Sequence, residues 1–515
     1  MVQRPGRSIA ALLLVAGGLG WTTSEPATAV SRCSSDPGQS SIQDVNDDSY
    51  PDVVVGVPLA SSDGRARAGV VDVHHPTTSV PPQRFGESYL GQTPVAGDGF
   101  GSAVAYTSLD APQGNLALGC PDLLIGAPGA AGGRGRVTVA LASPSGILPG
   151  PTATLTGRHP GDHFGAAVSV VDQDVWVGAP DQVVRGRAGA GAVYHYRVTG
   201  DGTLHLVGAL TEDSPGIPGV AEVDDHFGEV LSAGFGGFLA VGEPGEDAGR
   251  LADAGAVTVV TTRPDGAVAA AAKVGENSPG VPGVAAAGDR FGASVAGKEW
   301  LLVGVPGADV RGRRHAGAVQ LFDVAFGRSP RLRARARVTQ ESTGMPGASE
   351  VGDQFGAAVQ SGNEDCVWIG VPGDGLGGAA GTGEVLRTHR VGDARTLRLA
   401  AFGTVIRLGG PGSDNIPGAP QRGSHVGASL ATEAAQQVED TTGGETVVVA
   451  VPGLDGPATG SGQVWISRTS PSVGSQEPPT TGLAAGAYTD SAGAVAHEHY
   501  GTLARARTNG AAYGG

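Results

Sequence analysis

The stretch Gly288–Phe322, GDRFGASVAGKEWLLVGVPGADVRGRRHAGAVQLF, decides the fold because it contains the unit that the rest of the chain repeats. It opens with a Gly-Asp turn and the pair Phe291-Gly292, and three short apolar runs follow: ASVAG, WLLVGV and GAVQLF. The second run ends at Pro306-Gly307, and a loop rich in Gly and Arg separates it from the third. Short runs rich in Val and Leu and bounded by Gly, Pro and Asp are typical of β-strands rather than helices.

The same order of features recurs along the chain at a nearly fixed spacing. The first residue of the Phe-Gly pair recurs at steps of 64, 63, 64, 64 and 71, at Phe100, Phe164, Phe227, Phe291, Phe355 and, in a degenerate copy, Val426. The proline that closes the second run recurs at Pro58, Pro128, Pro180, Pro244, Pro306, Pro372 and Pro452. Seven units in register predict a repeat architecture built from one supersecondary unit.

The two ends of the repeat array are complementary. Each unit is expected to supply four strands, which we name A to D in chain order, with A directly after the Phe-Gly pair and B ending at the repeated proline. Unit 1 begins directly with its B strand at Val53–Val57. The tail segment His499–Ala504 resembles the A-strand start of unit 3 and has no B strand after it. Joining these ends leaves no unpaired blade edge, whereas the alternative is a disordered tail with a chance Tyr-Gly. We therefore predict an all-β, seven-bladed β-propeller with four-stranded blades, closed by the C-terminal strand joining blade 1.

Composition divides the chain into six segments. Arg4 and Arg7 precede an apolar run and the Ala27-Thr28-Ala29 cleavage pattern, which together predict a secretory signal peptide and a secreted protein. No later run is long enough for a membrane span. The predicted segments are the signal peptide at 1–29, a lead-in at 30–43, the blades at 44–469, a Ser/Pro/Thr-rich linker at 470–481, the closing segment at 482–506 and a tail at 507–515.

Charge and cysteine content limit the classes of partner. The formal net charge of −16 repels phosphate backbones, so we expect no nucleic-acid partner. The 88 glycines and 35 prolines would suit a disordered chain, but they fall at fixed positions between apolar runs and so indicate turns. Three cysteines leave one unpaired, and we favour a Cys33–Cys120 disulfide with Cys366 as a small buried residue.

One acidic loop has the spacing of a calcium site. The sequence from Asp44 to Asp52, DVNDDSYPD, places side-chain oxygens at positions 1, 3, 5 and 9, and the carbonyl of Tyr50 at position 7. Calcium takes six to eight hard oxygen ligands, which alternating carboxylates in a tight loop can supply. The predicted metal ligands are Asp44, Asn46, Asp48, Tyr50 and Asp52. The alternative is an acidic surface turn without an ion.

The Phe-Gly pairs, the D-x-N-x-D-x-x-x-D loop and the G-x-P and G-A-V elements together resemble FG-GAP repeats, as in the β-propeller of integrin α subunits and its secreted bacterial relatives. The resemblance covers roughly Asp44 to Ala504. It implies one calcium ion in a loop between strands A and B, and a binding or adhesion role. The chain departs from the family at Asp47 and Ser49, where glycine is usual, which bears on calcium affinity.

Several repeated polar positions have two interpretations. The aspartates before the Phe-Gly pairs either form a ring of ligands or, as we expect, cap their own turns: Asp98, Asp162, Asp225, Asp289 and Asp353. The histidines at the same turns either carry metal or acid–base chemistry or are solvated turn residues, the interpretation we favour: His163, His226, His425 and His499. Arginines in the B–C loops form either a basic binding rim or ordinary solvated loops: Arg185, Arg187, Arg250, Arg311, Arg313 and Arg314.

From these observations we expect a secreted, monomeric, calcium-stabilised scaffold that binds an extracellular protein or glycan. No G-x-S-x-G, H-E-x-x-H or phosphate-loop motif occurs, and a fold alone does not establish a function. The alternative is an exported hydrolase or lyase with its site at the central opening of the propeller. Glu229 and Glu243, where other units have Ala or Val, are the nearest candidates for such a site.

Overall fold

The structure is a computed structural model that describes residues 43–469 and 502–503 with gaps. The gaps are residues 49–51, 76–79, 108, 110–119, 151, 172, 200–201, 235–236, 264, 266, 299, 326–329, 363–364, 392–397, 410–415, 417–418, 433–444 and 452–462. The predicted signal peptide, linker and tail lie outside the described residues. Cys33 also lies outside them, while Cys120 is disulfide-bonded. Cys366, predicted to be buried, is a partly exposed thiol outside any disulfide that accepts a hydrogen bond from Arg387 Nη2 at 3.4 Å.

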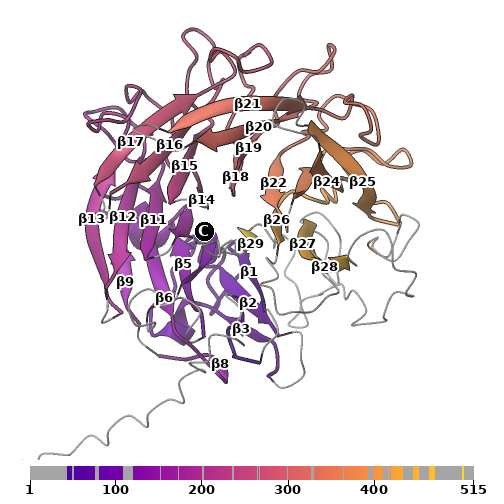
Figure 1. The fold of residues 1–515 in the computed structure, drawn as a ribbon. Coiled ribbons are helices and arrows are strands. Elements are labelled where there is room, and N and C mark those ends of the chain that lie inside the picture. The colour runs from indigo at the N-terminus through magenta and orange to yellow at the C-terminus, as the bar shows by residue number, and fades with distance from the viewer. Residues whose placement is uncertain are drawn as a thin grey trace, which may run out of the picture.

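The described strands form antiparallel sheets arranged around a central axis, as Figure 1 shows. Six sheets have four strands. They are β29 (Thr502–Leu503), β1 (Val53–Val57), β2 (Val70–His74) and β3 (Gln83–Phe85); β4 (Ala103–Thr107), β5 (Asp122–Ala127), β6 (Arg136–Ala140) and β9 (Thr154–Thr156); β10 (Val168–Val171), β11 (Asp174–Ala179), β12 (Ala192–Val198) and β13 (Leu204–Leu210); β14 (Val230–Gly234), β15 (Phe238–Glu243), β16 (Ala256–Thr262) and β17 (Val268–Val274); β18 (Ser294–Gly297), β19 (Trp300–Val305), β20 (Ala318–Ala325) and β21 (Arg331–Val338); and β22 (Ala358–Ser361), β23 (Cys366–Val371), β24 (Glu384–Val391) and β25 (Arg398–Arg407).

Smaller elements complete the described part of the chain. A three-stranded sheet contains β26 (Leu430–Thr432), β27 (Glu445–Val451) and β28 (Gln463–Thr469). A short hairpin pairs β7 (Ala142–Ser143) with β8 (Gly146–Ile147). The only helical turns are η1 (Glu87–Leu90) and α1 (Ala130–Gly133), and no helix in the described residues has the length and hydropathy of a membrane span.

The prediction of seven four-stranded blades is wrong. Within the described residues the molecule has six four-stranded blades, and the unit that begins near Val426 supplies only the three strands β26, β27 and β28. The sequence of this unit offers three apolar runs and then the Ser/Pro/Thr-rich stretch at 470–481. Proline has no N–H to donate to a strand ladder, so that stretch is a poor source of a fourth strand.

The first blade draws its strands from both ends of the chain. β29 pairs antiparallel with β1, with Leu503 opposite Val55 and Thr502 opposite Gly56. The C-terminal strand therefore supplies the innermost strand of the blade that contains β1, β2 and β3. This is the ring closure that the sequence predicts.

The Phe-Gly pairs join each blade to the next. All five phenylalanines of these pairs are fully buried, and Phe164 packs edge-to-face on Tyr194 with ring centroids 5.2 Å apart. The backbone of each pair also bridges to the glycine that precedes the third strand of the preceding blade, as in Gly135 with Phe164 and Gly255 with Phe291. The core therefore runs between the blades, and each sheet buries both faces against its neighbours.

Candidate functional site

The predicted calcium loop lies immediately before β1, and the structure describes four of its five predicted ligand residues. Tyr50 lies outside the described residues. The Asp48 N–H donates to Asp44 Oδ1 at 3.0 Å, and Asn46 Nδ2 donates to Asp48 Oδ2 at 3.2 Å. Asp44 and Asn46 are buried. The loop thus gathers Asp44, Asn46 and Asp48.

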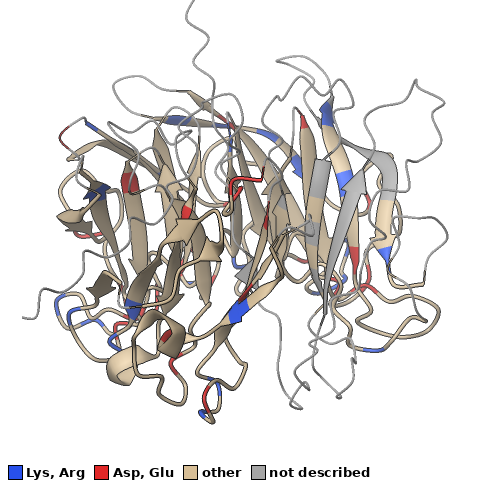
Figure 2. Ribbon diagram, turned by 90° about the horizontal axis from the view of Figure 1, so that it is seen from below, with Lys and Arg blue, Asp and Glu red and all other residues tan. Residues whose placement is uncertain are grey.

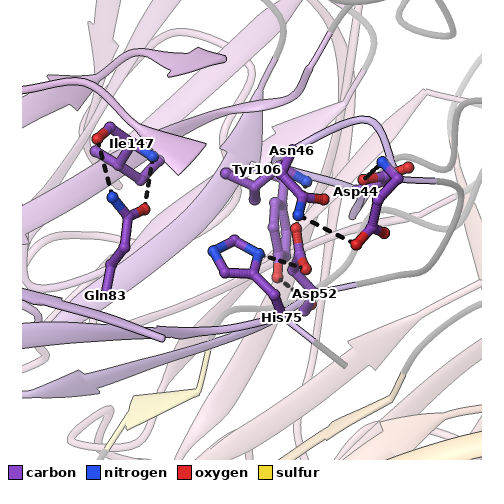
Figure 3. A network of polar contacts seen from close by, with 9 residues as sticks. Asp44, Asn46, Asp52, His75, Gln83, Tyr106 and Ile147 are labelled. Atoms are coloured by element: carbon purple, nitrogen blue, oxygen red, sulfur yellow. Dashed lines mark hydrogen bonds and ion pairs between the residues drawn. The ribbon is translucent and has the colours of Figure 1, made fainter. Parts of the chain in front are cut away.

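Asp52 has a different role from the other three residues. The Val45 N–H donates to its Oδ2 at 2.7 Å, and His75 Nδ1 lies 2.8 Å from its Oδ1 (Figure 3). The Tyr106 hydroxyl donates to its carbonyl oxygen at 3.0 Å. Burial raises the pKa of the Asp52 carboxyl, although the hydrogen bond from His75 opposes this shift. Asp52 therefore anchors the loop to β2 and β4, with both carboxylate oxygens already engaged.

The other oxygen atoms of the loop suit a hard cation as its ligands. Asn46 Oδ1 is buried and has no hydrogen-bond partner among the described residues, so it is an acceptor available to an ion. Carboxylate and amide oxygens are the ligands that calcium prefers. Asp47 adopts the left-handed conformation at φ 58°. Aspartate tolerates this conformation better than most residues, so the loop keeps its turn without a glycine at this position.

A second group of carboxylates, from Glu212, Glu243 and Glu246, surrounds the ammonium of Lys273 on β17. We name these four residues the buried carboxylate cluster. Lys273 Nζ donates to Glu212 and lies 2.8 Å from both Glu243 Oε2 and Glu246 Oε1. Burial raises the pKa of Glu212 to about 10 and that of Glu246 to about 7. Burial lowers the pKa of Lys273, but the three carboxylates outweigh it, so the ammonium keeps a pKa above its ordinary value.

The buried carboxylate cluster is structural. Arg337 lies 3.3 Å from Glu276, and Arg136 lies 3.3 Å from Glu87, so a cation meets a buried carboxylate at comparable places in other blades. The side chain of Glu243 is fully buried. Glu243, one of the two predicted candidates for an enzymatic site, is therefore closed off from solvent, and the lysine already supplies a positive charge beside it.

A third group lies where the innermost strands begin. His163, His226 and Arg290 are each the residue before a Phe-Gly pair, four residues ahead of the starts of β14 and β18 and five ahead of β10. Consecutive innermost strands β10, β14 and β18 contact one another around the axis. Glu229 directly precedes β14, and Asp181 follows Pro180 at the end of β11. We name His163, Asp181, His226, Glu229 and Arg290 the axial cluster.

The axial cluster is a continuous chain of ionisable groups. Asp181 Oδ2 contacts His163 Nδ1, and Asp181 Oδ1 lies 3.2 Å from His226 Nε2. His226 Nδ1 lies 3.7 Å from Glu229 Oε2, and Glu229 Oε1 lies 3.5 Å from Arg290 Nη2. The five side chains are between 31 and 53 % exposed, so solvent and small molecules can reach them.

The backbone holds the two histidines in place. His163 and His226 both adopt left-handed φ angles, 50° and 55°. The His163 N–H donates to the Gly133 carbonyl at 2.9 Å, and the His226 N–H donates to the Gly189 carbonyl at 2.8 Å. The same φ angle and the same kind of hydrogen bond recur at Arg290, Gln354 and His425, so this backbone geometry belongs to the repeated turn and fixes where its side chain starts.

The central carboxylate and the imidazole of His226 shift each other's pKa. The hydrogen bond from His226 is the largest effect on Asp181 and holds the pKa of its carboxyl below the ordinary value. The same hydrogen bond raises the pKa of His226 above its ordinary value. The pair of an imidazolium and a carboxylate is thus stabilised relative to the two neutral groups.

Other predicted polar positions have structural roles. The aspartates before the Phe-Gly pairs accept a backbone N–H from three residues earlier, as Asp98 does from Val95 at 2.7 Å and Asp162 from His159 at 2.9 Å, which confirms the predicted caps. Two of the arginines considered for a basic rim face an acidic partner: Arg185 and Arg187 lie 3.4 and 3.5 Å from Asp213. Figure 2 shows acidic and basic residues interspersed over the loops rather than gathered by sign.

Sequence reasoning missed Asp181, although a signal for it exists. The residue after the repeated proline is glycine in five units and leucine in the first, at Gly129, Gly245, Gly307, Gly373, Gly453 and Leu59. Asp181 is the exception. His425 occupies the same turn position as His163 and His226, but glycine follows the repeated proline in its own unit and in the unit before it. Its Nδ1 contacts the Pro372 carbonyl at 3.0 Å instead. His499 lies outside the described residues.

Comparisons with known proteins show no family for this chain. No family model matches the chain, and no curated protein matches it. Among solved structures, the chain is similar to the periplasmic gluconolactonase PpgL of Pseudomonas aeruginosa, with 15 % sequence identity and a TM-score of 0.44. This match covers 87 % of the present chain and 97 % of that structure.

Proposed function

We propose that this protein is an exported hydrolase or lyase whose site is the axial cluster. The observation that carries the proposal is the position of Asp181, whose two carboxylate oxygens face one imidazole each. Titratable groups that perturb one another at an accessible place near the axis are typical of acid–base sites. Export rests on the predicted signal peptide at 1–29.

The cluster offers both partners of an acid–base reaction. Because Asp181 accepts from Nδ1 of His163, Nε2 of that ring is directed away from the carboxylate and can take a proton from water or from a substrate carbon. Any side chain at Gly133 would bring a Cβ atom to 3.3 Å from that nitrogen, so the glycine leaves this space open. The protonated His226 can return a proton to the leaving group. Arg290 and Glu229 would orient a polar substrate beside them.

The test is turnover on a broad panel of secreted-enzyme substrates, including lactones, esters and glycosides, by the wild type and Asp181→Asn. We expect a substrate whose turnover falls at least about a hundredfold in Asp181→Asn, the scale of general acid–base catalysis. His425→Ala is the matched control, because it changes the same repeat position outside the cluster. Turnover that survives Asp181→Asn contradicts the proposal. Retention of a glycan or extracellular protein without any turnover would instead favour the scaffold function.

We also propose that the loop at 44–52 binds one calcium ion through Asp44, Asn46 and Asp48, with the Tyr50 carbonyl as a further ligand. The unpaired, buried Asn46 Oδ1 supports this proposal. The loop lies before the second strand of its blade, at the opposite end of the innermost strands from the Phe-Gly turns, so the ion would stabilise the fold rather than take part in the reaction.

Thermal melts in calcium and in chelator test this site. Calcium at 100 times its Kd should add about 2.7 kcal/mol to the unfolding free energy. Asp44→Ala should remove that gain, whereas Asp265→Asn, at an exposed turn, should keep it. If calcium does not change the melting temperature of the wild type, the site is not a calcium site.

A further inference from the structure

The loops that carry the axial cluster also carry exposed valines, and we propose that Val183, Val220 and Val223 bind an aliphatic chain of the substrate on which the cluster acts. We name these three residues the valine patch. The inference rests on the proposed function, because it names the class of substrate that the proposed site takes. It adds an apolar binding surface to a cluster that contains only polar side chains.

The valine patch is one surface although its residues come from two loops. Val183 directly precedes Val184 in the loop after β11, and Val220 and Val223 flank Ala221 in the loop before β14. Val184 and Ala221 are buried together in one small apolar cluster, so their exposed neighbours lie at the same junction between blades. Val183, Val220 and Val223 are 56, 58 and 60 % exposed, so more than half of each residue is open to a ligand.

The same two loops connect the valine patch to the axial cluster. Val183 lies two residues after Asp181, and Val223 lies three residues before His226. An extended chain spans at most about 3.6 Å per residue, so the Cα atoms of these pairs are at most about 7 and 11 Å apart. A backbone hydrogen bond of 3.0 Å, donated by Asp224 to the other loop, holds the two loops together. A substrate with its reactive group at the cluster can therefore extend a chain over the patch.

The repeat shows that the fold does not require this patch. Val183 is the third residue after the repeated proline, and that place is polar or small in the other six units, at Ser61, Ala131, Asp247, Asp309, Gly375 and Asp455. The same loop also departs from the repeat at Asp181, where the other units have glycine or leucine. Two departures in one loop, an acid in the cluster and an apolar residue beside it, favour a shared function.

The size and the charge of the patch favour a single chain over a second protein or a membrane. Three valines that are little more than half exposed offer a small part of the roughly 800 Å² per partner that a stable protein interface buries. Glu222 and Asp224 are exposed on either side of Val223, and their carboxylates are repelled by an anionic lipid surface. A hydrocarbon chain gains free energy from each methylene that leaves water, so a small patch is sufficient for it.

Two measurements on the full chain test the inference. The first is turnover of the substrate that the panel identifies, in a homologous series whose alkyl chain grows from acetyl through butanoyl to octanoyl. The second is saturation-transfer NMR with 1-butanol and 1-octanol, which reports binding without any reaction. Val183→Asp places in the patch the residue that units 4 and 5 already have there, so the loop should fold. Val351→Asp adds the same charge at the exposed counterpart of Val223, two blade junctions away, and is the matched control.

We expect kcat/KM to rise about tenfold from the butanoyl to the octanoyl substrate. A fully buried methylene is worth about fourfold, and a surface that covers one side of the chain should give about twofold for each methylene. Val183→Asp should remove most of this rise and reduce the octanol signal at least about threefold. Val351→Asp should behave as the wild type does in both measurements.

The outcomes separate this inference from the proposed function. A kcat/KM that does not depend on chain length, or that depends on it equally in both variants, overturns the valine patch and leaves the hydrolase standing. Octanol binding that Val183→Asp removes, without turnover of any substrate, supports the patch and counts against the hydrolase. Binding of phosphatidylcholine vesicles in place of the alcohols, or self-association in sedimentation that Val183→Asp abolishes, would assign the patch to a membrane or to a second copy and overturn the inference.

Discussion

The carbonyl oxygen of Gly165 lies 2.0 Å from the place that a Cβ atom on Gly126 would occupy. Gly126 is in the second strand of one blade, and Gly165 belongs to the Phe-Gly pair of the next. The same approach recurs around the ring between Gly56 and Gly101, Gly178 and Gly228, Gly242 and Gly292, Gly304 and Gly356, and Gly370 and Gly427. The repeated glycines of the sequence signature thus mark contact points between blades, where no side chain fits.

Gly126→Ala should destabilise the propeller by at least about 2 kcal/mol, because the new methyl group meets backbone that cannot move without separating two blades. Gly208→Ala is the matched control. A Cβ atom at position 208 meets nothing within 4 Å, and this glycine also lies in a strand. Urea unfolding measures both variants. Equal midpoints for the two variants would show that the blades adjust easily to the added methyl.

Lys273→Met should cost about 3 kcal/mol of unfolding free energy, because it leaves Glu212, Glu243 and Glu246 without their shared cation. Arg263→Met is the control, since Arg263 pairs with Asp265 at an exposed turn. Chemical denaturation at pH 7 gives the comparison. A loss no larger than that of the control would mean that the carboxylates become neutral at little cost.

Adding Glu243→Val to Lys273→Met should restore part of that loss. Valine occupies the equivalent place in four other units, at Val57, Val305, Val371 and Val451, so the side chain fits this environment. The double variant also removes one of the carboxylates that the lysine balances. If it is less stable than Lys273→Met alone, the interaction between the two residues is not the dominant effect.

The unfolding free energy should fall as the pH rises from about 5 to 8, because several buried carboxyl groups keep their protons in the folded state. Burial raises the pKa of Glu87 to about 8, and of Glu246 and Glu384 to about 7. A raised carboxyl pKa contributes stability that is complete below the ordinary value of 4.5 and is lost as the pH passes the folded value.

Glu87→Gln replaces the protonated carboxyl with a neutral amide of the same shape and should reduce the slope of stability with pH. We expect the variant to gain at least about 1 kcal/mol on the wild type between pH 5 and 8. Glu222→Gln, at an exposed position, should follow the wild type. Denaturant midpoints at pH 5, 6.5 and 8 measure how steeply stability changes with pH. Parallel curves for wild type and Glu87→Gln would contradict a raised pKa at Glu87.

The period of the Phe-Gly pairs was sufficient to predict a propeller, its strand order and its closure by the C-terminal strand, since these follow from local patterns that repeat. The number of complete blades was not predictable from the same count. Val426 marks a unit by its turn, but a blade needs a fourth strand, and within the described residues this unit has three. The repeated turn therefore shows how many units the chain contains, but not how many strands each unit contributes to its sheet.

The candidate site was harder to predict, because it depends on which loops meet around the axis. His163 and His226 are 63 residues apart, and only the stacking of blades brings Asp181 between them. The pattern of repeated positions favours solvated turns for these histidines, and two of them instead share a carboxylate. The calcium loop was predictable in its residues, but the engagement of Asp52 by His75 depends on β2 lying beside β1.

Leu503→Pro should weaken the closure of the ring, because proline removes the N–H of a residue that pairs with Val55 in the first blade. Within the described residues the pairing of β29 with β1 covers two residues on each strand, so the loss of one donor affects a large part of the pairing that the structure describes. We expect a lower melting temperature and faster proteolysis of the first blade. A chain that ends after Ala504 keeps both paired residues and is the control, which should melt as the wild type does. If Leu503→Pro matches this control, the pairing contributes little, and the ring is held by contacts between the blades alone.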